Sequence, residues 1–191
     1  YYKCLKCNHF SGLLKMDIGN LYSSEYNNSI YSGKLKKNFD KINKLPNAKS
    51  DNFFRVERIH NFLKSKIHNT DKFKILDIGS GLGIFPYKMK KKKYNVVALD
   101  PDKRSCSHIK KNLKIKVIHG DFLKKKIEGK YNLITLNKVL EHVENPKIML
   151  VKVKKILQKN GLIYIEVPDI KASIQGKSRE EFHIDHLHVF S

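Results

Sequence analysis

An apolar run that ends in a carboxylate and spaced glycines constrains the fold of this chain more than any other segment. Residues 75–83 read Ile-Leu-Asp-Ile-Gly-Ser-Gly-Leu-Gly. The apolar residues predict a buried strand, and the glycines predict a tight turn at which backbone can approach a ligand with no Cβ in the way. A strand, a glycine turn and a helix in this order are typical of the first unit of a doubly wound α/β sheet.

The spacing of these glycines and the charge of Asp77 indicate which ligand the turn would accept. The dinucleotide fingerprint G-x-G-x-x-G needs a glycine at position 84, where this chain has Ile84. A pyrophosphate at the turn would also lie beside the negative charge of Asp77, which is unfavourable. S-adenosylmethionine carries an ammonium and a sulfonium but no phosphate, so the turn favours this methyl donor over NAD.

Strand and helix signals alternate from residue 72 onward, as in consecutive βαβ units. Strands are predicted over 73–78, 95–99, 115–119, 131–136 and 162–167. Helices are predicted over 84–92, after a cap at Asp102, and from Asn145-Pro146 to Asn160-Gly161. The strands are almost continuously apolar, which predicts a mainly parallel, Rossmann-like α/β sheet covered on both faces.

Two of these helices have a predicted core face. The face of the helix after Asp102 is expected to hold Cys106, Ile109 and Leu113. The face of the last helix is expected to hold Ile148, Leu150, Val153 and Leu157.

The chain divides near residue 70, where Asn69-Thr70-Asp71 interrupts the pattern. Residues 1–70 form an extension rich in Asn, Ser, Tyr and Lys, and one stretch has apolar residues at helical spacing: Phe54, Ile59, Phe62, Leu63 and Ile67. We predict a helical substrate cap within residues 1–70 and a cofactor-binding domain over 71–191. Both ends are expected to be truncated, the second after the fifth strand.

The charge of the chain is strongly basic, with 39 Lys and Arg against 18 Asp and Glu, a formal net charge of +21. Such a charge would attract nucleic acid or anionic lipid. Only four of the basic residues are arginine, the residue suited to bidentate phosphate recognition. Scattered lysines with many Asn and Ile fit a compositional bias and a solvated surface, so specific nucleic-acid binding is not expected. A polyanion-binding surface is the alternative.

Membrane insertion is not indicated either. No apolar run approaches the roughly 20 residues that span a bilayer. A cytoplasmic location is predicted.

Residues 75–169 together resemble the class I S-adenosylmethionine-dependent methyltransferases, and more narrowly the branch that methylates quinone precursors and sugar derivatives. The resemblance rests on four segments in order: ILDIGSGLG at 75–83, VVALDPD at 96–102, HGDF at 119–122 and LITLNKVLEHVENP at 133–146. It implies methyl transfer to an oxygen or carbon atom of a small-molecule acceptor. An RNA methyltransferase and a non-catalytic cofactor-binding or assembly module are the alternatives.

The resemblance implies which residues hold the methionine part of the cofactor. Backbone around Gly79, Ser80 and Gly81 would contact it, and Asp77 would hold its ammonium, partly through water. Asn137 follows the fourth strand and would lie beside the methyl group.

A second set of residues would hold the nucleoside part. Asp100 would accept both ribose hydroxyls, with Pro101 beside it. Asp121 would accept a hydrogen bond from the adenine amino group, or would only form a turn. Phe122 would provide an apolar wall, or would only pack in the core.

Catalysis in this class needs the acceptor to be aligned with the methyl group. A hydroxyl or carbon acid must also lose a proton, and histidine is the natural base near neutral pH. The candidates are His142 in the LEHV segment and His186 in the run DHLHVFS at 185–191, which resembles the HLxxFS segment of the family. His186 is favoured, with Asp185 as a residue that could orient its ring.

Cysteine and histidine groups also raise the question of a metal. Cys4-Leu5-Lys6-Cys7 is half of a tetrahedral zinc site. With the Tyr-rich stretch at 21–26 it resembles the second half of a zinc ribbon that precedes some of these methyltransferases. Zinc would then be bound only in a longer protein, and the alternative is that both cysteines are free. A cluster of His183, Asp185, His186 and His188 is compatible with a metal too, but methyl transfer does not require one.

Overall fold

A five-stranded parallel sheet forms the centre of the molecule. The computed structural model describes residues 1–12, 35–67, 69–171, 175–176, 182 and 185–190. The strand order is β5-β4-β3-β6-β7, and every neighbouring pair is parallel. The strands are β3 (Lys74–Ile78), β4 (Asn95–Asp100), β5 (Lys116–His119), β6 (Tyr131–Asn137) and β7 (Leu157–Glu166). The predicted parallel α/β sheet is therefore confirmed.

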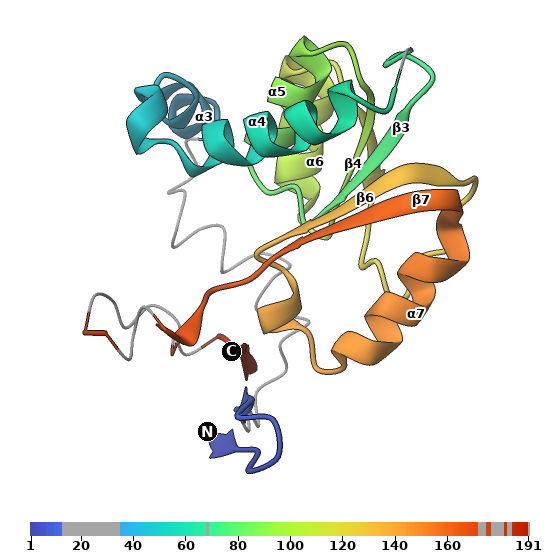
Figure 1. The fold of residues 1–191 in the computed structure, drawn as a ribbon. Coiled ribbons are helices and arrows are strands. Elements are labelled where there is room, and N and C mark those ends of the chain that lie inside the picture. Colours follow the sequence, from blue (N-terminus) through green and yellow to red (C-terminus); the bar gives the residue numbers. More distant parts are fainter. Residues whose placement is uncertain (13–34, 68, 172–174, 177–181, 183–184, 191) are drawn as a thin grey trace.

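Helices cover both faces of this sheet (Figure 1). On one face lie α3 (Leu35–Asn43), α4 (Asp51–Lys64), α5 (Ile84–Lys91) and α6 (Lys103–Asn112), and on the other lies α7 (Pro146–Ile156). The short helices η2 (Asn47–Lys49) and η3 (Leu140–His142) precede α4 and α7. One core cluster joins α7 to the sheet. Two other clusters join the helices α3, α4, α5 and α6 to the opposite face of the sheet.

Strand alternation places the polar strand ends on one face of the sheet. Ile75 and Leu133 pack in the cluster beneath α4 and α5, and Asp77 and Thr135 lie two residues further along the same strands. Because successive side chains of a strand point to opposite faces, these polar residues share the face covered by α4 and α5.

The start of α6 confirms two predictions. The Asp102 side chain accepts hydrogen bonds from the backbone N–H groups of Arg104 and Ser105, at 3.2 and 3.1 Å. It is therefore the helix cap, as predicted. The expected core residues of this segment, Cys106, Ile109 and Leu113, are all buried.

The predicted end of the last helix is wrong. The helix ends at Ile156, and β7 begins at Leu157 rather than at Leu162. Leu157 pairs with Tyr131, and Leu162 pairs with Leu133. Between these two pairs, β7 has four residues where β6 has one. The Asn-Gly signal at 160–161 therefore marks a bulge within the strand, with Asn160 at φ 60°, and not a helix terminus.

Two predicted apolar faces are also partly wrong. On α7 the buried positions are Met149, Val153 and Ile156, whereas Ile148 is 57% exposed. On α4, Ile59 and Leu63 are buried as expected, but Phe54 and Phe62 are exposed. In both helices, a residue next to the expected one lies on the side that faces the sheet.

The extension packs on the sheet. Val56 and Leu63 of α4 share a core cluster with Ile75 and Phe85. Close to the chain ends, β1 (Tyr2–Lys3), β2 (Phe10–Ser11) and β8 (His188–Val189) form a small antiparallel sheet. The domain boundary at residue 70 stays a prediction. Within the described ranges no helix has the length and apolar character to cross a bilayer.

Candidate active site

The glycine turn after β3 has the backbone geometry that the sequence predicts. Gly79 and Gly83 have φ values of 72° and 77°. A Cβ on Gly79 would lie 2.7 Å from Val139 Cγ2, so both conformation and space require glycine there. The N–H groups of Gly79 and Ser80 donate to the Leu99 carbonyl at 2.9 and 3.1 Å, which joins the turn to β4.

Asp77 is a buried carboxylate at the end of β3. Its Oδ1 accepts hydrogen bonds from Thr135 Oγ1 at 2.7 Å and Asn137 Nδ2 at 2.9 Å. Burial raises the pKa of Asp77 to about 6, although hydrogen bonds from Thr135, Ser80 and Asn137 and the charge of Arg55 oppose this rise. A carboxylate in this position is stabilised by a cation.

Asn137 presents a buried acceptor beside Asp77. Its Nδ2 is used by the bond to Asp77, whereas its Oδ1 has no hydrogen-bond partner within the described part of the chain. A buried polar atom without a partner costs about 1–3 kcal/mol. The site therefore favours a ligand that donates a hydrogen bond at this point.

Asp100 occupies the end of β4 and closes the other side of the glycine turn. Its Oδ2 accepts from the Gly81 N–H at 2.7 Å, and its Oδ1 accepts from the Asp102 N–H at 2.9 Å. Burial raises the pKa of Asp100 to about 6, against the effect of these two bonds. Each carboxylate oxygen can accept a further hydrogen bond. Pro101, next in the chain, is half-buried, and its carbonyl lies 3.1 Å from His119 Nε2.

The residues predicted to surround adenine have local structural roles. Asp121 is exposed, and its Oδ1 accepts from the Leu123 N–H at 2.8 Å, so its side chain helps to form the turn. Phe122 is buried and packs in the core cluster beneath α7. The contacts of both residues with adenine stay predictions.

An ion pair between buried Arg55 of α4 and half-buried Glu166 of β7 was missed in the sequence. Arg55 donates to both carboxylate oxygens of Glu166, with Nε at 2.8 Å from Oε2. Tyr164 donates to Oε2 at 2.9 Å. Burial alone would raise the pKa of Glu166, but the bidentate contact with Arg55 outweighs it and lowers the pKa.

One signal could have revealed this pair. Glu166 is a carboxylate at the end of an apolar strand, the same pattern that singled out Asp77 and Asp100. Its partner can be identified only in the tertiary structure. Arg55 lies 111 residues earlier, in a helix that was predicted from its apolar residues alone. The charge of Arg55 also acts on Asp77, so the pair belongs to the site.

The two predicted catalytic histidines lie together. The rings of His142 and His186 have centroids 4.8 Å apart at an interplanar angle of 70°. His142 Nδ1 lies 3.0 Å from the Asp185 carbonyl and 3.5 Å from its Oδ2. The carboxylate expected to orient His186 is thus placed against His142.

Glu141 lies beside this histidine pair and directly precedes His142 in the chain. It is fully buried, and neither carboxylate oxygen has a hydrogen-bond partner among the residues described. Burial raises the pKa of Glu141 to about 7. Glu141, His142 and His186 each offer a potential ligand atom within 4.8 Å of the others, a spacing that a metal ion could bridge.

The predicted metal cluster stays a prediction, while the group with metal-ligand spacing among the described residues is Glu141, His142 and His186. His188 contacts His9, with Nδ1 and Nε2 3.0 Å apart, and its own Nε2 lies 3.4 Å from the Glu144 carbonyl. His183 lies outside the described residues, as does the Tyr-rich stretch at 21–26. β8 thus uses His188 to hold the N-terminal hairpin.

Cys4 and Cys7 lie in the hairpin between β1 and β2, and both are exposed. The Cys4 N–H donates to the His9 carbonyl, and the Asn8 N–H donates to the Cys4 carbonyl, both at 2.8 Å. Hydrogen bonds from the N–H groups of Cys7 and Lys6 lower the pKa of the Cys4 thiol. The zinc half-site stays a prediction.

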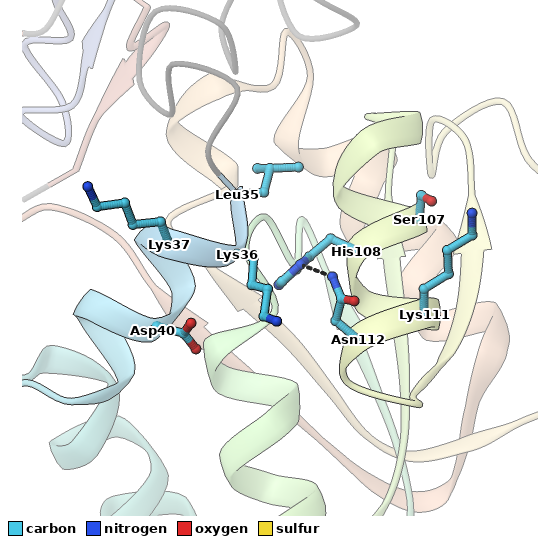
Figure 2. Close-up of a pocket in the computed structure, with 8 residues that line it drawn as sticks. All are labelled: Leu35, Lys36, Lys37, Asp40, Ser107, His108, Lys111 and Asn112. Carbon is cyan, nitrogen blue, oxygen red and sulfur yellow. Dashed lines mark hydrogen bonds between the residues drawn. The ribbon is translucent and has the colours of Figure 1, made fainter.

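A cavity of about 590 Å³ lies between α3 and α6, away from the strand ends (Figure 2). Figure 2 shows the ring of His108 and the amide of Asn112 directed from α6 toward Lys36. His108 Nδ1 lies 2.9 Å from Asn112 Nδ2. None of the carboxylates at the strand ends lines this cavity, so volume alone does not identify the active site.

Residues 19–191 match a family model described as a methyltransferase domain. The ubiquinone biosynthesis O-methyltransferase of Pelagibacter ubique is 31% identical over 154 residues, which cover 68% of this chain and 63% of that protein. The protein of the same name from Rickettsia typhi is 28% identical over 119 residues, 60% of this chain and 48% of that one. The chain thus spans about half to three fifths of the length of these relatives.

Solved structures share the fold at low sequence identity. The plantazolicin methyltransferase BpumL, in complex with a desmethylPZN analogue and SAH, has a TM-score of 0.63 and 21% identity, covering 86% of this chain and 63% of that one. An S-adenosylmethionine-dependent methyltransferase from Clostridium acetobutylicum has a TM-score of 0.61 and 18% identity, with coverages of 74% and 60%. These similarities agree with the sheet topology described above.

Proposed function

The chain belongs to the methyltransferase domain family, and on this premise we propose that it transfers a methyl group from S-adenosylmethionine to a small-molecule acceptor. The proposed acceptor atom is an oxygen or carbon nucleophile of a sugar-like or quinone-like compound. The relatives named as ubiquinone biosynthesis O-methyltransferases support this acceptor class.

The observation that carries the proposal is the buried, unpartnered Oδ1 of Asn137 beside the Asp77 carboxylate, within the described residues. Both groups accept hydrogen bonds, and Asp77 attracts positive charge. The ammonium of a bound methionine moiety would supply both the donor and the charge. A phosphate would supply neither, so the donor set fits S-adenosylmethionine better than a dinucleotide.

Asp100 would hold the ribose in the same way. Bonds from Gly81 and Asp102 fix its carboxylate, and each oxygen can still accept from one hydroxyl. Pro101 would flank the nucleoside, while Asp121 and Phe122 would approach the adenine from the end of β5.

The cofactor, when bound, supplies a methyl group on a positively charged sulfur that retains the electron pair of the broken bond. The contribution of the chain is then to align the acceptor and to receive its proton. We assign the proton to a ring nitrogen of His186, with His142 packed against it. The backbone carbonyl of Asp185 holds the ring of His142 in place.

Titration calorimetry with S-adenosylhomocysteine tests the cofactor part of this proposal. We expect the wild-type chain to bind, and Asp100→Asn to weaken binding by about tenfold or more, since charge-assisted hydrogen bonds contribute about 1.5–3 kcal/mol. Asp71→Asn is the matched control, because Asp71 is an exposed aspartate before β3. Absence of wild-type binding at millimolar ligand, with the fold intact, would overturn the proposal.

A further inference from the structure

The segment that carries His186 contacts a hairpin from the opposite end of the sequence. The hairpin comprises residues 1–12, in which β1 pairs with β2, and β2 in turn pairs with β8 (Figure 1). Phe10 lies opposite Val189, and Ser11 lies opposite His188. The hairpin is therefore hydrogen-bonded to a strand that begins two residues after His186.

Hydrogen bonds from two sides fix the peptide group that follows His186. The Tyr1 hydroxyl donates to the His186 carbonyl at 2.9 Å, and the Leu187 N–H donates to the Glu141 carbonyl at 2.6 Å. The next carbonyl, that of Leu187, accepts from the Gly12 N–H at 2.8 Å. One peptide group thus connects the hairpin to η3, and a shift of the His186 backbone would lengthen or break these bonds.

This backbone determines where the His186 ring lies. Burial alternates along residues 185–190, with Leu187 and Val189 only 5% and 1% exposed and His186 and His188 half-buried. On the half-buried side, the His186 ring contacts the His142 ring edge-on. Because a side chain follows the direction that its backbone gives to Cβ, the hydrogen bonds of the hairpin also hold this ring against its neighbour.

Tyr1 and Gly12 each fit a specific contact in the hairpin. A Cβ on Gly12 would lie 3.3 Å from the His186 carbonyl oxygen and 3.4 Å from Tyr1 Cε1. The Tyr1 ring packs edge-on against Phe182, with centroids 5.2 Å apart. Burial and the charge of Asp185 raise the pKa of the Tyr1 hydroxyl, so this group remains a protonated donor at neutral pH.

We propose that the N-terminal hairpin positions His186 for methyl transfer, with Tyr1 as a positioning residue that acts through the His186 carbonyl, a role that rests on the proposed function. A general base must lie within hydrogen-bond reach of the proton that it accepts. A displacement of about 1 Å can lower the rate about 100-fold. The hairpin thus contributes to turnover through the backbone of another segment.

A hairpin that only stabilised the fold would give a different pattern of effects. Loss of a stabilising contact lowers the melting temperature, but the molecules that remain folded turn over normally. Loss of positioning lowers kcat in the folded protein, while cofactor binding stays as it is. The two roles are therefore separated by measuring kcat, cofactor affinity and stability on the same variants.

Hydrogen exchange of the full chain, measured by mass spectrometry, tests the positioning without an acceptor. Tyr1→Phe removes the bond to the His186 carbonyl and keeps the ring, and Gly12→Ala crowds the same carbonyl. Both should raise exchange at residues 185–190 by about 3- to 10-fold, the equivalent of one lost hydrogen bond. Tyr2→Phe is the matched control in β1, where Tyr2 is 66% exposed, and should leave exchange unchanged. Unchanged exchange in both test variants would overturn the proposal.

Turnover with a catechol acceptor, 3,4-dihydroxybenzoate, tests the catalytic consequence. In Tyr1→Phe and Gly12→Ala, kcat should fall by about tenfold, while S-adenosylhomocysteine affinity and melting temperature stay near those of Tyr2→Phe. Raised exchange with a normal kcat in both variants would also overturn the proposal, because the hairpin would then only stabilise the segment.

The same measurements separate this proposal from the proposed function. If the wild type binds no S-adenosylhomocysteine, the proposed function fails. If it binds S-adenosylhomocysteine but methylates no catechol, the proposed quinone-like acceptor fails. In either case, exchange at residues 185–190 still decides whether the hairpin holds the His186 backbone.

Discussion

The two edges of the parallel sheet have opposite chemical character. Where the strands end, buried carboxylates meet a glycine turn, a buried amide and a histidine pair. Where the strands begin, the first residues of β3 and β5, Lys74 and Lys116, are exposed. Charged groups on the first edge are desolvated, so their pKa values shift, whereas the lysines of the second remain hydrated.

This contrast separates two uses of charge in one fold. Desolvated carboxylates act at short range and need a partner of defined geometry, as in a cofactor site. Hydrated lysines act together over about a Debye length, near 8 Å at physiological salt, and need only an extended negative partner. Substitutions at the first edge should therefore change chemistry or stability strongly, and single substitutions at the second should change little.

The largest expected effect comes from one histidine at the strand-end side. His186→Ala should lower turnover by about 10²–10⁴, the usual contribution of general acid–base catalysis, and leave S-adenosylhomocysteine affinity nearly unchanged. His60→Ala is the counterpart on α4, where His60 contacts the Tyr94 hydroxyl just before β4, and should leave turnover of the folded protein unchanged. Equal activity of His186→Ala and wild type would assign His186 to packing and move the search to His142.

The Arg55–Glu166 ion pair should give the next largest effect. Arg55→Met leaves Glu166 without its bidentate partner and should lower the free energy of unfolding by about 3 kcal/mol in denaturant titrations. Arg58→Met, which removes an exposed arginine of the same helix, should cost less than about 1 kcal/mol. Similar losses for both variants would contradict the importance of burial at Arg55.

A pH titration sharpens the contrast between buried and hydrated charge. Asp77 and Asp100 have pKa values of about 6 when folded and near 3.8 when unfolded. The folded state therefore takes up protons at a higher pH than the unfolded state. Their contribution to the free energy of unfolding of the ligand-free chain should therefore rise as the pH falls through 6 toward 3.8, by up to about 3 kcal/mol per carboxylate. S-adenosylhomocysteine affinity should fall over the same range.

Two variants isolate that contribution from other groups. Glu166 acts oppositely, because its lowered pKa gives stability that is lost on acidification. Asp100→Asn should remove part of the rise that the wild type shows, whereas Asp71→Asn should leave the pH dependence as it is. If the free energy of unfolding has the same pH dependence in Asp100→Asn and in the wild type, Asp100 is not the source of that dependence.

The smallest expected effect lies just before β4, at the edge where the strands begin. Lys93→Gly should raise the free energy of unfolding by about 0.5–1 kcal/mol, since glycine adopts the left-handed conformation without strain. Lys91→Gly, in the last turn of α5, should instead lower it by a similar amount. Thermal melts of the two variants should therefore shift in opposite directions.

Much of the fold and of the cofactor edge was predictable from local patterns. Strand-end carboxylates, the glycine turn and the Asp102 cap depend on residues close together in the chain, so Asp77, Asp100 and Asn137 could be placed at one edge in advance. The helix end at Ile156 was not predictable in this way, because pairing with β6 and not the local Asn-Gly signal decides where β7 begins.

The remaining features depend on contacts between distant segments. Arg55 and Glu166 are 111 residues apart, and Glu141 meets His186 only because the segment at 185–190 folds back onto η3. Local sequence thus determined the strands, the turn and the acidic strand ends, because backbone preference and hydrophobic periodicity act over a few residues. Tertiary structure decided the ion pair and the histidine cluster, because desolvation depends on which segments become neighbours.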